Sequence, residues 1–446
     1  MTALLLLAAS FLGTLIASRR SLVAGIAAVC ATGYAYGVIR ANVPGLATHF
    51  LFDASVIALY LSQFVLARWN DRSPEAGRLG LWVGVLVLWP ALLVLMPGQD
   101  LLVQLVGLRG NVFLVLFLLL GARLRSADLQ KLAIVLGVLN LLAFAFAVVQ
   151  FIFGVEPFFP PGPLTELIYR SNDVGPQGQL RIPSSFPSAH AFAATMLISL
   201  PLLAGAMTLE KRRAVQFLLS ASILCSILAI FLASTRLYVV MLAGLTAYLF
   251  FSGKVFQRYR TRFLLMVGVV ALVVFSQERM QRFVSVFDVG LVTERVGWSI
   301  NRSFLDLAAR YPLGNGLGAG GTSVPHFLED RIRDRVIMEN EYARIMLEQG
   351  MGGLLLWVAF IVWLMVRSRP KAGEPWELSR RMFRVLIGAQ FAAGLIGIGL
   401  FTAIPQSALL FLFAGWIVMP QRALRTEGMR SQVRSGPRPL AGRVYG

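Results

Sequence analysis

Apolar stretches of roughly bilayer thickness follow one another along almost the whole chain. A helix needs about 20 consecutive apolar residues to cross the hydrocarbon core of a membrane. Thirteen candidate spans approach or reach this length: residues 3–18, 22–39, 46–66, 79–96, 101–120, 129–153, 189–206, 214–233, 237–251, 263–275, 342–366, 385–401 and 407–419. Because helices satisfy their own backbone inside lipid, we predict an all-α polytopic integral membrane protein with about 12–13 transmembrane helices.

The composition supports a membrane protein and argues against a nucleic-acid-binding one. Of the 446 residues, 57% are hydrophobic and 14% are charged, whereas soluble domains carry about 25% charged residues. The net charge of +19 comes from Lys and Arg in short segments beside apolar spans, which is typical of membrane proteins. Cys30 and Cys225 lie within apolar stretches, so we expect them to fill the core and predict neither a disulfide framework nor a cysteine metal site.

Successive loops alternate in charge. Lys and Arg outnumber Asp and Glu in residues 18–21, 67–78, 121–131, 209–213, 253–262 and 367–384 and in the tail from residue 420. Basic loops stay in the cytoplasm, so the loops between them, including two long ones, are expected on the outer side. This alternation divides the chain into N-terminal spans (1–153), a first long outer loop (154–187), central spans with the Arg236 turn (188–276), a second long outer loop (277–339), C-terminal spans (340–419) and a basic cytoplasmic tail (420–446), which we expect to contact anionic lipid.

The second long outer loop carries most of the residues suited to chemistry. Residues 295–310 place polar and apolar side chains at three- and four-residue spacing, which predicts an amphipathic helix on the membrane surface that ends at Pro312. The turn that follows contains Gly316, Gly318 and Gly321 in the pattern G-x-G-x-x-G, but no strand precedes it, so a dinucleotide site is not predicted. Its N–H groups could approach a phosphate; the alternative is a flexible turn.

The span after this loop begins with charged residues. Asn340 is expected to cap the helix, with Glu339 at its positive end. Glu341, Arg344 and Glu348 share one helix face, and we interpret them as a self-neutralising stripe that holds the bundle together. Glu339 differs from these residues because it lies at the aqueous edge, where a carboxylate can accept a proton from a sugar hydroxyl.

Four motifs resemble one known family. They are Ser234-Thr235-Arg236 at the start of a span, Arg295 with Trp298, P-L-G-N-G-L-G at residues 312–318 and E-N-E-Y…L-E-Q-G-M-G-G at residues 339–353. In this order they resemble the O-antigen ligase and O-antigen polymerase family, over residues 181–356. The resemblance implies a bacterial inner-membrane enzyme whose periplasmic pocket holds a polyprenyl-pyrophosphate-linked glycan. It also implies that Arg236 and Arg295 bind the pyrophosphate, and that neither a metal nor another cofactor is needed.

One difference from the family decides between its two activities. Ligases carry a His before the Asn of the last motif, whereas this chain has Glu339. The difference favours a polymerase that joins exopolysaccharide or O-antigen repeats; the alternative is a ligase that transfers the glycan to lipid A–core or another acceptor. The expected partners are the lipid-linked donor, a saccharide acceptor and membrane lipids, and a chain-length regulator is a further candidate.

The predicted site follows from the chemistry of such a donor. A glycan on a lipid diphosphate already has a good leaving group, so the enzyme must bind two negative charges and position an acceptor hydroxyl. Arginine suits this task because its fork matches phosphate oxygens and stays charged. We assign Glu339, Arg295 and Arg236 as catalytic residues. The expected substrate-binding residues are Arg181, Arg109, Asn340, Tyr342, His326, Gly316 and Gly318, of which the first two could instead anchor the chain at the interface.

Three alternatives involve the histidines or transport. His190, in F-P-S-A-H-A, resembles an element of lipid phosphatases, but their downstream His and Asp are missing from this sequence. His49 is expected to be a packing residue, and His326 is a reserve candidate for the proton acceptor. Polar groups inside a bundle also mark the pathways of transporters. A flippase for lipid-linked glycans is less favoured, since the sequence has no internal repeat and its ionisable groups cluster at one face.

Overall fold

The computed structural model describes residues 1–43, 45–66, 73–96, 98–170, 180–251, 304–322, 324–336, 338, 340–370, 373–399 and 401–420, together with Leu265, Gly268, Gly290 and Gly297. These parts form helices, and no strand lies among them. Among the described residues, eight helices are long and apolar enough to cross a membrane, and shorter apolar helices accompany them. The chain is therefore an all-α multi-pass membrane protein, as predicted.

The long spans are α1 (Thr2–Arg20), α2 (Leu22–Asn42), α5 (Pro74–Leu93), α6 with α7 (Leu101–Val112 and Phe117–Ala122), α8 (Ser126–Phe153), α10 (Ala189–Leu209), α11 (Arg213–Leu232) and α16 (Glu341–Arg367). The shorter apolar helices are α4 with the π-helix η1 (Leu51–Tyr60 and Leu61–Leu66), α12 (Arg236–Phe251) and α18 (Gln406–Val418). The remaining described helices are α3 (Leu46–His49), α9 (Glu166–Arg170), α15 (Phe304–Arg310), the 3-10 helix η3 (His326–Arg331) and α17 (Glu377–Ala393).

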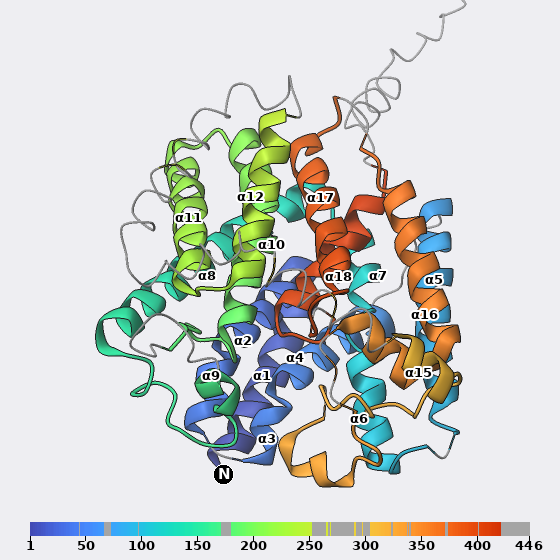
Figure 1. Ribbon diagram of the computed structural model, residues 1–446. Coiled ribbons are helices and arrows are strands. Elements are labelled where there is room, and N and C mark those ends of the chain that lie inside the picture. Colours follow the sequence, from blue (N-terminus) through green and yellow to red (C-terminus); the bar gives the residue numbers. More distant parts are fainter. Residues whose placement is uncertain are drawn as a thin grey trace, which may run out of the picture.

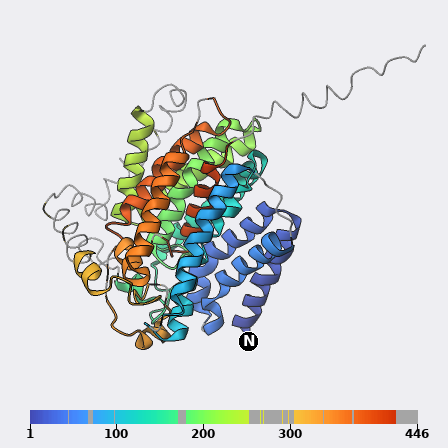
Figure 2. The same ribbon diagram turned by 90° about the vertical axis from the view of Figure 1, so that its right-hand side faces the viewer.

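The helices lie side by side in one bundle (Figure 1). Figure 2 shows α1, α2 and α4 (blue) on one side of this bundle and α12 and α16 on the other. Residues 154–170 and 180–188 and the described parts of 304–336 lie at one end, at the bottom of Figure 1, which we call the loop end. Helices α10, α12, α16 and α18 all run away from the loop end, so their positive N-termini point towards it.

Helix α10 lies at the centre of the bundle, between α8, α11, α17 and α18. All of its residues from Ala189 to Ala206 are buried except His190. A polar cluster ties it to its neighbours. Asn140 on α8 accepts a hydrogen bond from the Tyr34 hydroxyl on α2 (2.6 Å) and donates to Ser199 on α10 (2.7 Å) and Ser226 on α11 (2.8 Å). Such hydrogen bonds hold helices together where lipid supplies no hydrophobic driving force.

One predicted span is wrong in its position. Residues 385–401 were expected to cross the membrane, and 367–384 to form a cytoplasmic loop, but the helix is α17, Glu377–Ala393. Its charged first half is buried because Arg380 stacks on Trp416 (5.0 Å to the ring centroid) and donates to the Met419 carbonyl at the end of α18. Residues 394–399, predicted to be helical, instead form turns that contact the start of α16.

The other predicted spans agree with the described helices within a few residues, although 46–66 is divided into α3, α4 and η1. Of the predicted span 263–275, only Leu265 and Gly268 are described, and the basic tail from residue 421 lies outside the described residues. Of the predicted amphipathic helix 295–310, Gly297 and the part from Phe304 are described, and this part is helical up to Arg310, just before Pro312. This part, α15, packs against α16 through the buried Leu307.

Candidate functional site

Helix α16 begins with a capped first turn inside the protein. Asn340 is the N-cap, and its side chain accepts a hydrogen bond from the Ala343 N–H (2.5 Å), as predicted. The Glu341 N–H donates to the carbonyls of Gly394 (2.8 Å) and Gly397 (3.0 Å). The start of α16 is therefore fixed by its own cap and by the turn that follows α17.

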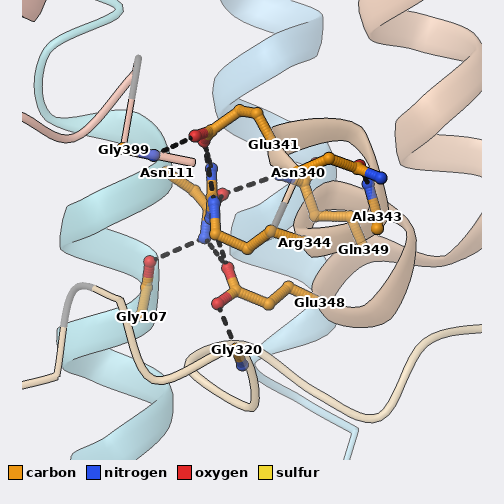
Figure 3. A network of polar contacts seen from close by, with 10 residues as sticks. All are labelled: Gly107, Asn111, Gly320, Asn340, Glu341, Ala343, Arg344, Glu348, Gln349 and Gly399. Carbon is orange, nitrogen blue, oxygen red and sulfur yellow. Dashed lines mark hydrogen bonds and ion pairs between the residues drawn. The ribbon is translucent and has the colours of Figure 1, made fainter. Parts of the chain in front are cut away.

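Side chains from the first turns of α16 and from α6 form a buried ionic cluster (Figure 3). Arg344 lies between two carboxylates, 2.7 Å from Glu341 and 2.7 Å from Glu348, and the three side chains are at most 1% exposed. Asn111 on α6 accepts a hydrogen bond from Arg344 (2.9 Å) and from Gln349 (2.9 Å), and it donates to Glu348 (2.7 Å). We call these five residues the ionic cluster.

Each carboxylate oxygen of the cluster has a donor. The second oxygen of Glu341 accepts a hydrogen bond from the Gly399 N–H (2.6 Å), and that of Glu348 accepts one from the Gly320 N–H (3.3 Å). The predicted self-neutralising stripe is thus confirmed. Sequence reasoning missed Asn111, Gly320 and Gly399. A lone polar residue in an apolar span could have pointed to Asn111, but nothing local indicated the two glycines.

Helix α16 is interrupted directly after the last residue of the cluster, Gln349. Gly350 has φ +68°, which breaks the helical hydrogen-bond pattern. The free backbone groups are bound from outside the helix. The Asn315 N–H donates to the Leu347 carbonyl (2.6 Å), the Met351 N–H donates to the Pro312 carbonyl (3.0 Å), and the Trp89 indole donates to the Gln349 carbonyl (3.1 Å). The glycine-rich segment that begins at Pro312 is therefore inserted into the break.

The predicted phosphate-binding glycines pack tightly on α6. Gly316 and Gly318 have φ values of +94° and +83°, which favour glycine. A Cβ atom at Gly316 would lie 3.1 Å from Gln99, and one at Gly318 would lie 2.7 Å from the Val103 carbonyl oxygen. These contacts explain both glycines by close packing.

Gln99 fastens the same segment to the bundle. Its amide nitrogen donates to the carbonyls of Asn315 (3.0 Å) and Arg333 (2.9 Å), and its amide oxygen accepts from the Arg333 N–H (2.8 Å). The described parts of residues 312–333 are thus held on α6 and α16 together.

Arg236, the first residue of α12, is half-buried. Its Nε is buried and makes no hydrogen bond with any part of the chain that the structure describes. The neighbouring Leu237 lies 4.0 Å from the position that a Cβ atom on Gly397 would take. Because Gly397 also accepts a hydrogen bond from Glu341, one turn contacts the beginnings of both α12 and α16. The structure therefore brings the Arg236 turn close to the start of α16, although the two are far apart in sequence.

The other predicted arginines lie at different places. Arg109 on α6 forms an ion pair with Asp53 (3.0 Å), and its side chain is 28% exposed. Arg181 is half-buried in the segment that precedes α10. That segment is fixed to α2 and α8, since Ser185 accepts a hydrogen bond from Val38 (3.0 Å) and Ser184 accepts one from Gln150 (2.9 Å).

The remaining predicted site residues divide into described and undescribed ones. The Tyr342 hydroxyl is buried and donates to the Phe391 carbonyl (2.8 Å), so it links α16 to α17. Glu339, Arg295 and the side chain of His326 lie outside the described structure. Their placement at the site stays a prediction.

Two histidines lie against aromatic rings. His49 is buried, and its ring centroid is 5.5 Å from that of Phe327, which agrees with the predicted packing role. His190 is exposed, and its ring centroid lies 6.5 Å from that of Tyr238 on α12. Comparison with known proteins adds no further assignment to the site: no protein-family model matches this chain, and no curated protein matches it.

Proposed function

We propose that the protein is a membrane glycosyltransferase that polymerises polyprenyl-pyrophosphate-linked oligosaccharide repeats into exopolysaccharide or O-antigen. The observation that carries the proposal is the position of Arg236. The Nε atom of its guanidinium is buried and has no hydrogen-bond partner among the described residues. The turn at Gly397 contacts both the start of α12 and the capped start of α16. Glu339 directly precedes the Asn340 cap in the sequence. A permanent cation beside a helix start suits a diphosphate ester.

The proposed reaction is a displacement at the anomeric carbon. The acceptor hydroxyl oxygen attacks this carbon, the bond from the carbon to the phosphate oxygen breaks, and the polyprenyl diphosphate leaves. Arg236 and Arg295 bind the departing negative charge, and Glu339 takes the proton of the hydroxyl or orients it. The loop end is the outer face in this proposal, in a bacterial inner membrane.

Glu339 favours a polymerase over a ligase within this proposal. The ligases that the sequence resembles carry a His at the corresponding position, so the two activities differ in the group next to the helix cap. A ligase that transfers the glycan to lipid A–core or another acceptor is the second candidate. The two are separated by the product, which is a longer lipid-linked glycan in one case and a glycan on a different acceptor in the other.

The interrupted helix α16 is also a feature of transporters, whose broken helices bind substrate with their free backbone groups. Here these groups are bound by Pro312, Asn315 and Trp89. The Arg344 side chain is likewise bound by its own cluster. Little at the break remains to bind a transported glycan, so a transferase is the better proposal.

Replacement of Arg236 tests the proposal. In an assay with purified protein and defined lipid-linked repeats, Arg236→Ala should abolish polymer formation. Arg236→Lys should restore little, because an ammonium lacks the fork that matches two phosphate oxygens. Polymer of normal length and rate from Arg236→Ala would remove the proposed role.

The same assay separates donor binding from proton transfer. Glu339→Gln should lower turnover by about 10²–10⁴-fold while donor binding persists. Arg212→Ala is a matched control at the opposite end of the bundle, where Arg212 is 68% exposed and pairs with Glu210; it should leave the rate unchanged. If Glu339→Gln turned over normally and His326→Ala were inactive, the proton acceptor would be His326.

A further inference from the structure

Arg344 pairs with two carboxylates, one more than a single cation needs for neutrality. Its ion pair with Glu348 would be enough, yet Glu341 lies equally close, at 2.7 Å, and is as deeply buried. A buried charge in excess of those that are paired is costly unless hydrogen bonds stabilise it. The second carboxylate therefore indicates a task besides the neutralisation of Arg344.

The two carboxylate oxygens of Glu341 have different partners (Figure 3). Oε1 accepts a hydrogen bond from Nε of Arg344 (2.8 Å), and Nη2 of the same guanidinium lies 2.7 Å from it. Oε2 instead accepts a hydrogen bond from the Gly399 N–H (2.6 Å). The carboxylate thus joins the ionic cluster to residues 394–399, which we call the 394–399 turn.

The backbone of Glu341 binds the same turn. Its N–H donates to the carbonyls of Gly394 and Gly397. A Cβ atom at Gly394 would lie 3.5 Å from Cβ of Glu341, so the turn lies directly against this residue. The backbone and the side chain of one residue therefore hold both ends of the 394–399 turn.

The 394–399 turn also contacts the first residues of α12. A Cβ atom at Gly397 would lie 4.0 Å from Cδ2 of Leu237, the residue that follows Arg236. Helix α17, which leads into the turn, packs against α12. The position of the turn therefore bears on the position of Arg236.

We propose that Glu341 is a positioning residue for donor binding. Through the 394–399 turn it holds the start of α12, and with it Arg236, in the place that suits a diphosphate. This inference rests on the proposed function, since it takes Arg236 to bind the diphosphate of the lipid-linked donor. Glu341 does not contact the donor in this proposal, because its carboxylate is buried in the ionic cluster.

Replacing Glu341 by Gln should break the link to the turn selectively. The amide oxygen should stay with Arg344, because an NH2 group turned towards a guanidinium would place donor against donor. The NH2 group then takes the place of Oε2 and faces the Gly399 N–H, which is also a donor. Arg344 keeps Glu348 as its counter-ion, so the variant should still fold.

Diphosphate binding measures the consequence, and the sign of the change is decisive. With the full-length protein in nanodiscs, Glu341→Gln should raise the Kd for farnesyl diphosphate and for inorganic pyrophosphate about threefold to tenfold, less than the loss of a hydrogen bond to a charged group. Coulomb attraction alone predicts the opposite, because removal of a negative charge favours the binding of an anion. Glu348→Gln removes the same charge from the same cluster but leaves the Gly399 bond, so it should not raise the Kd.

A second pair of variants acts on backbone turns and leaves the ionic cluster intact. Gly399 has φ +86°, which disfavours alanine, and the nearest described atom to an added Cβ is Oγ1 of Thr402 at 4.0 Å. Gly399→Ala should therefore shift the backbone without a clash and raise the same Kd, and it decides the matter where Glu341→Gln does not fold.

Gly373→Ala is the matched control for Gly399→Ala. Gly373 has φ +79°, no described atom within 4 Å of its Cβ position and an N–H that donates to Glu377 (2.7 Å). It precedes α17 at the opposite end of the bundle, where this helix meets the end of α18. Probe binding should therefore stay at the wild-type level.

Hydrogen–deuterium exchange tests the geometry without any ligand. Amides of the 394–399 turn and of the first turn of α12 should exchange faster in Glu341→Gln than in the wild-type protein, because the contacts that protect them are weakened. In Glu348→Gln they should exchange at the wild-type rate. Faster exchange along the whole chain of Glu341→Gln would mean general destabilisation and would overturn the proposal.

The outcomes separate the positioning role from the proposed function. An unchanged or lower Kd in Glu341→Gln, an equal rise in Glu348→Gln, or no binding of either probe to the wild-type protein would overturn the positioning role. The expected changes in Kd, with no polymer made by the wild-type protein, would leave the positioning role standing and remove the polymerase. Polymer made by the wild-type protein, with a wild-type Kd in Glu341→Gln, would do the reverse.

Discussion

Arg344 is the residue on which the interior of this protein depends most directly. One buried cation serves two buried carboxylates, Glu341 and Glu348. Removing one partner of a buried ion pair typically costs about 3–5 kcal/mol, because the remaining charge is left unpaired. Arg367, at the far end of the same helix, pairs with Glu75 at a 42% exposed position, where a pair contributes about 0–1 kcal/mol.

These two arginines give a matched prediction. Arg344→Ala should destabilise the protein strongly, by several times the effect of Arg367→Ala, since it leaves two carboxylates inside the bundle. Thermal unfolding in detergent, followed by the loss of monodisperse protein, measures both variants. Equal unfolding temperatures for the two would mean that the cluster contributes no more than a surface pair.

At the scale of elements, α16 consists of two helical parts joined at Gly350. A Cβ atom there would lie 2.6 Å from the Leu313 carbonyl carbon, and the positive φ adds strain for any other residue. Gly350→Ala should therefore expel the inserted segment. Gly244→Ala on α12 is the control, because no atom lies within 4 Å of its Cβ position. Limited proteolysis should cut Gly350→Ala within residues 312–336 faster than it cuts Gly244→Ala; equal rates would contradict the insertion.

Local hydropathy predicted most elements but misplaced α17. The segment 377–384 carries Glu377, Arg380, Arg381 and Arg384, and such a charge density is not expected inside a bundle. Arg380 is buried there because it stacks on Trp416 and meets carbonyls at the end of α18. This pairing joins segments that are distant in sequence, so no local pattern could show it.

At the scale of the whole molecule, orientation in the membrane is the main prediction. The charge alternation assigns the loop end to the outer side. In a background with Cys30 and Cys225 replaced by Ser, a cysteine at the exposed Gly162 should react with a membrane-impermeant thiol reagent added to spheroplasts. A cysteine at the exposed Lys211, at the opposite end, should react after lysis alone. The reverse pattern would invert the topology.

The site was predictable where its pattern lies within one helix. Spacing alone indicated the Glu341, Arg344 and Glu348 stripe and the Asn340 cap. The partners of that stripe could not be predicted, because Asn111 lies 237 residues before Glu348. Long-range pairing of single polar residues is set by helix packing, which periodicity does not encode.

The long separation between Asn111 and its partners also has a consequence for biosynthesis. At about 5–20 residues per second, a ribosome needs roughly 10 to 50 s to translate the 237 residues from Asn111 to Glu348. During this time α6 can already lie in the bilayer while the Arg344 guanidinium does not yet exist. During this time α6 itself can satisfy part of the Asn111 side chain, because the amide nitrogen donates to the Gly107 carbonyl four residues before it (2.8 Å). The amide oxygen gains its partners, Arg344 and Gln349, only when α16 has been made, so this part of the bundle can be completed only after α16 has entered the membrane.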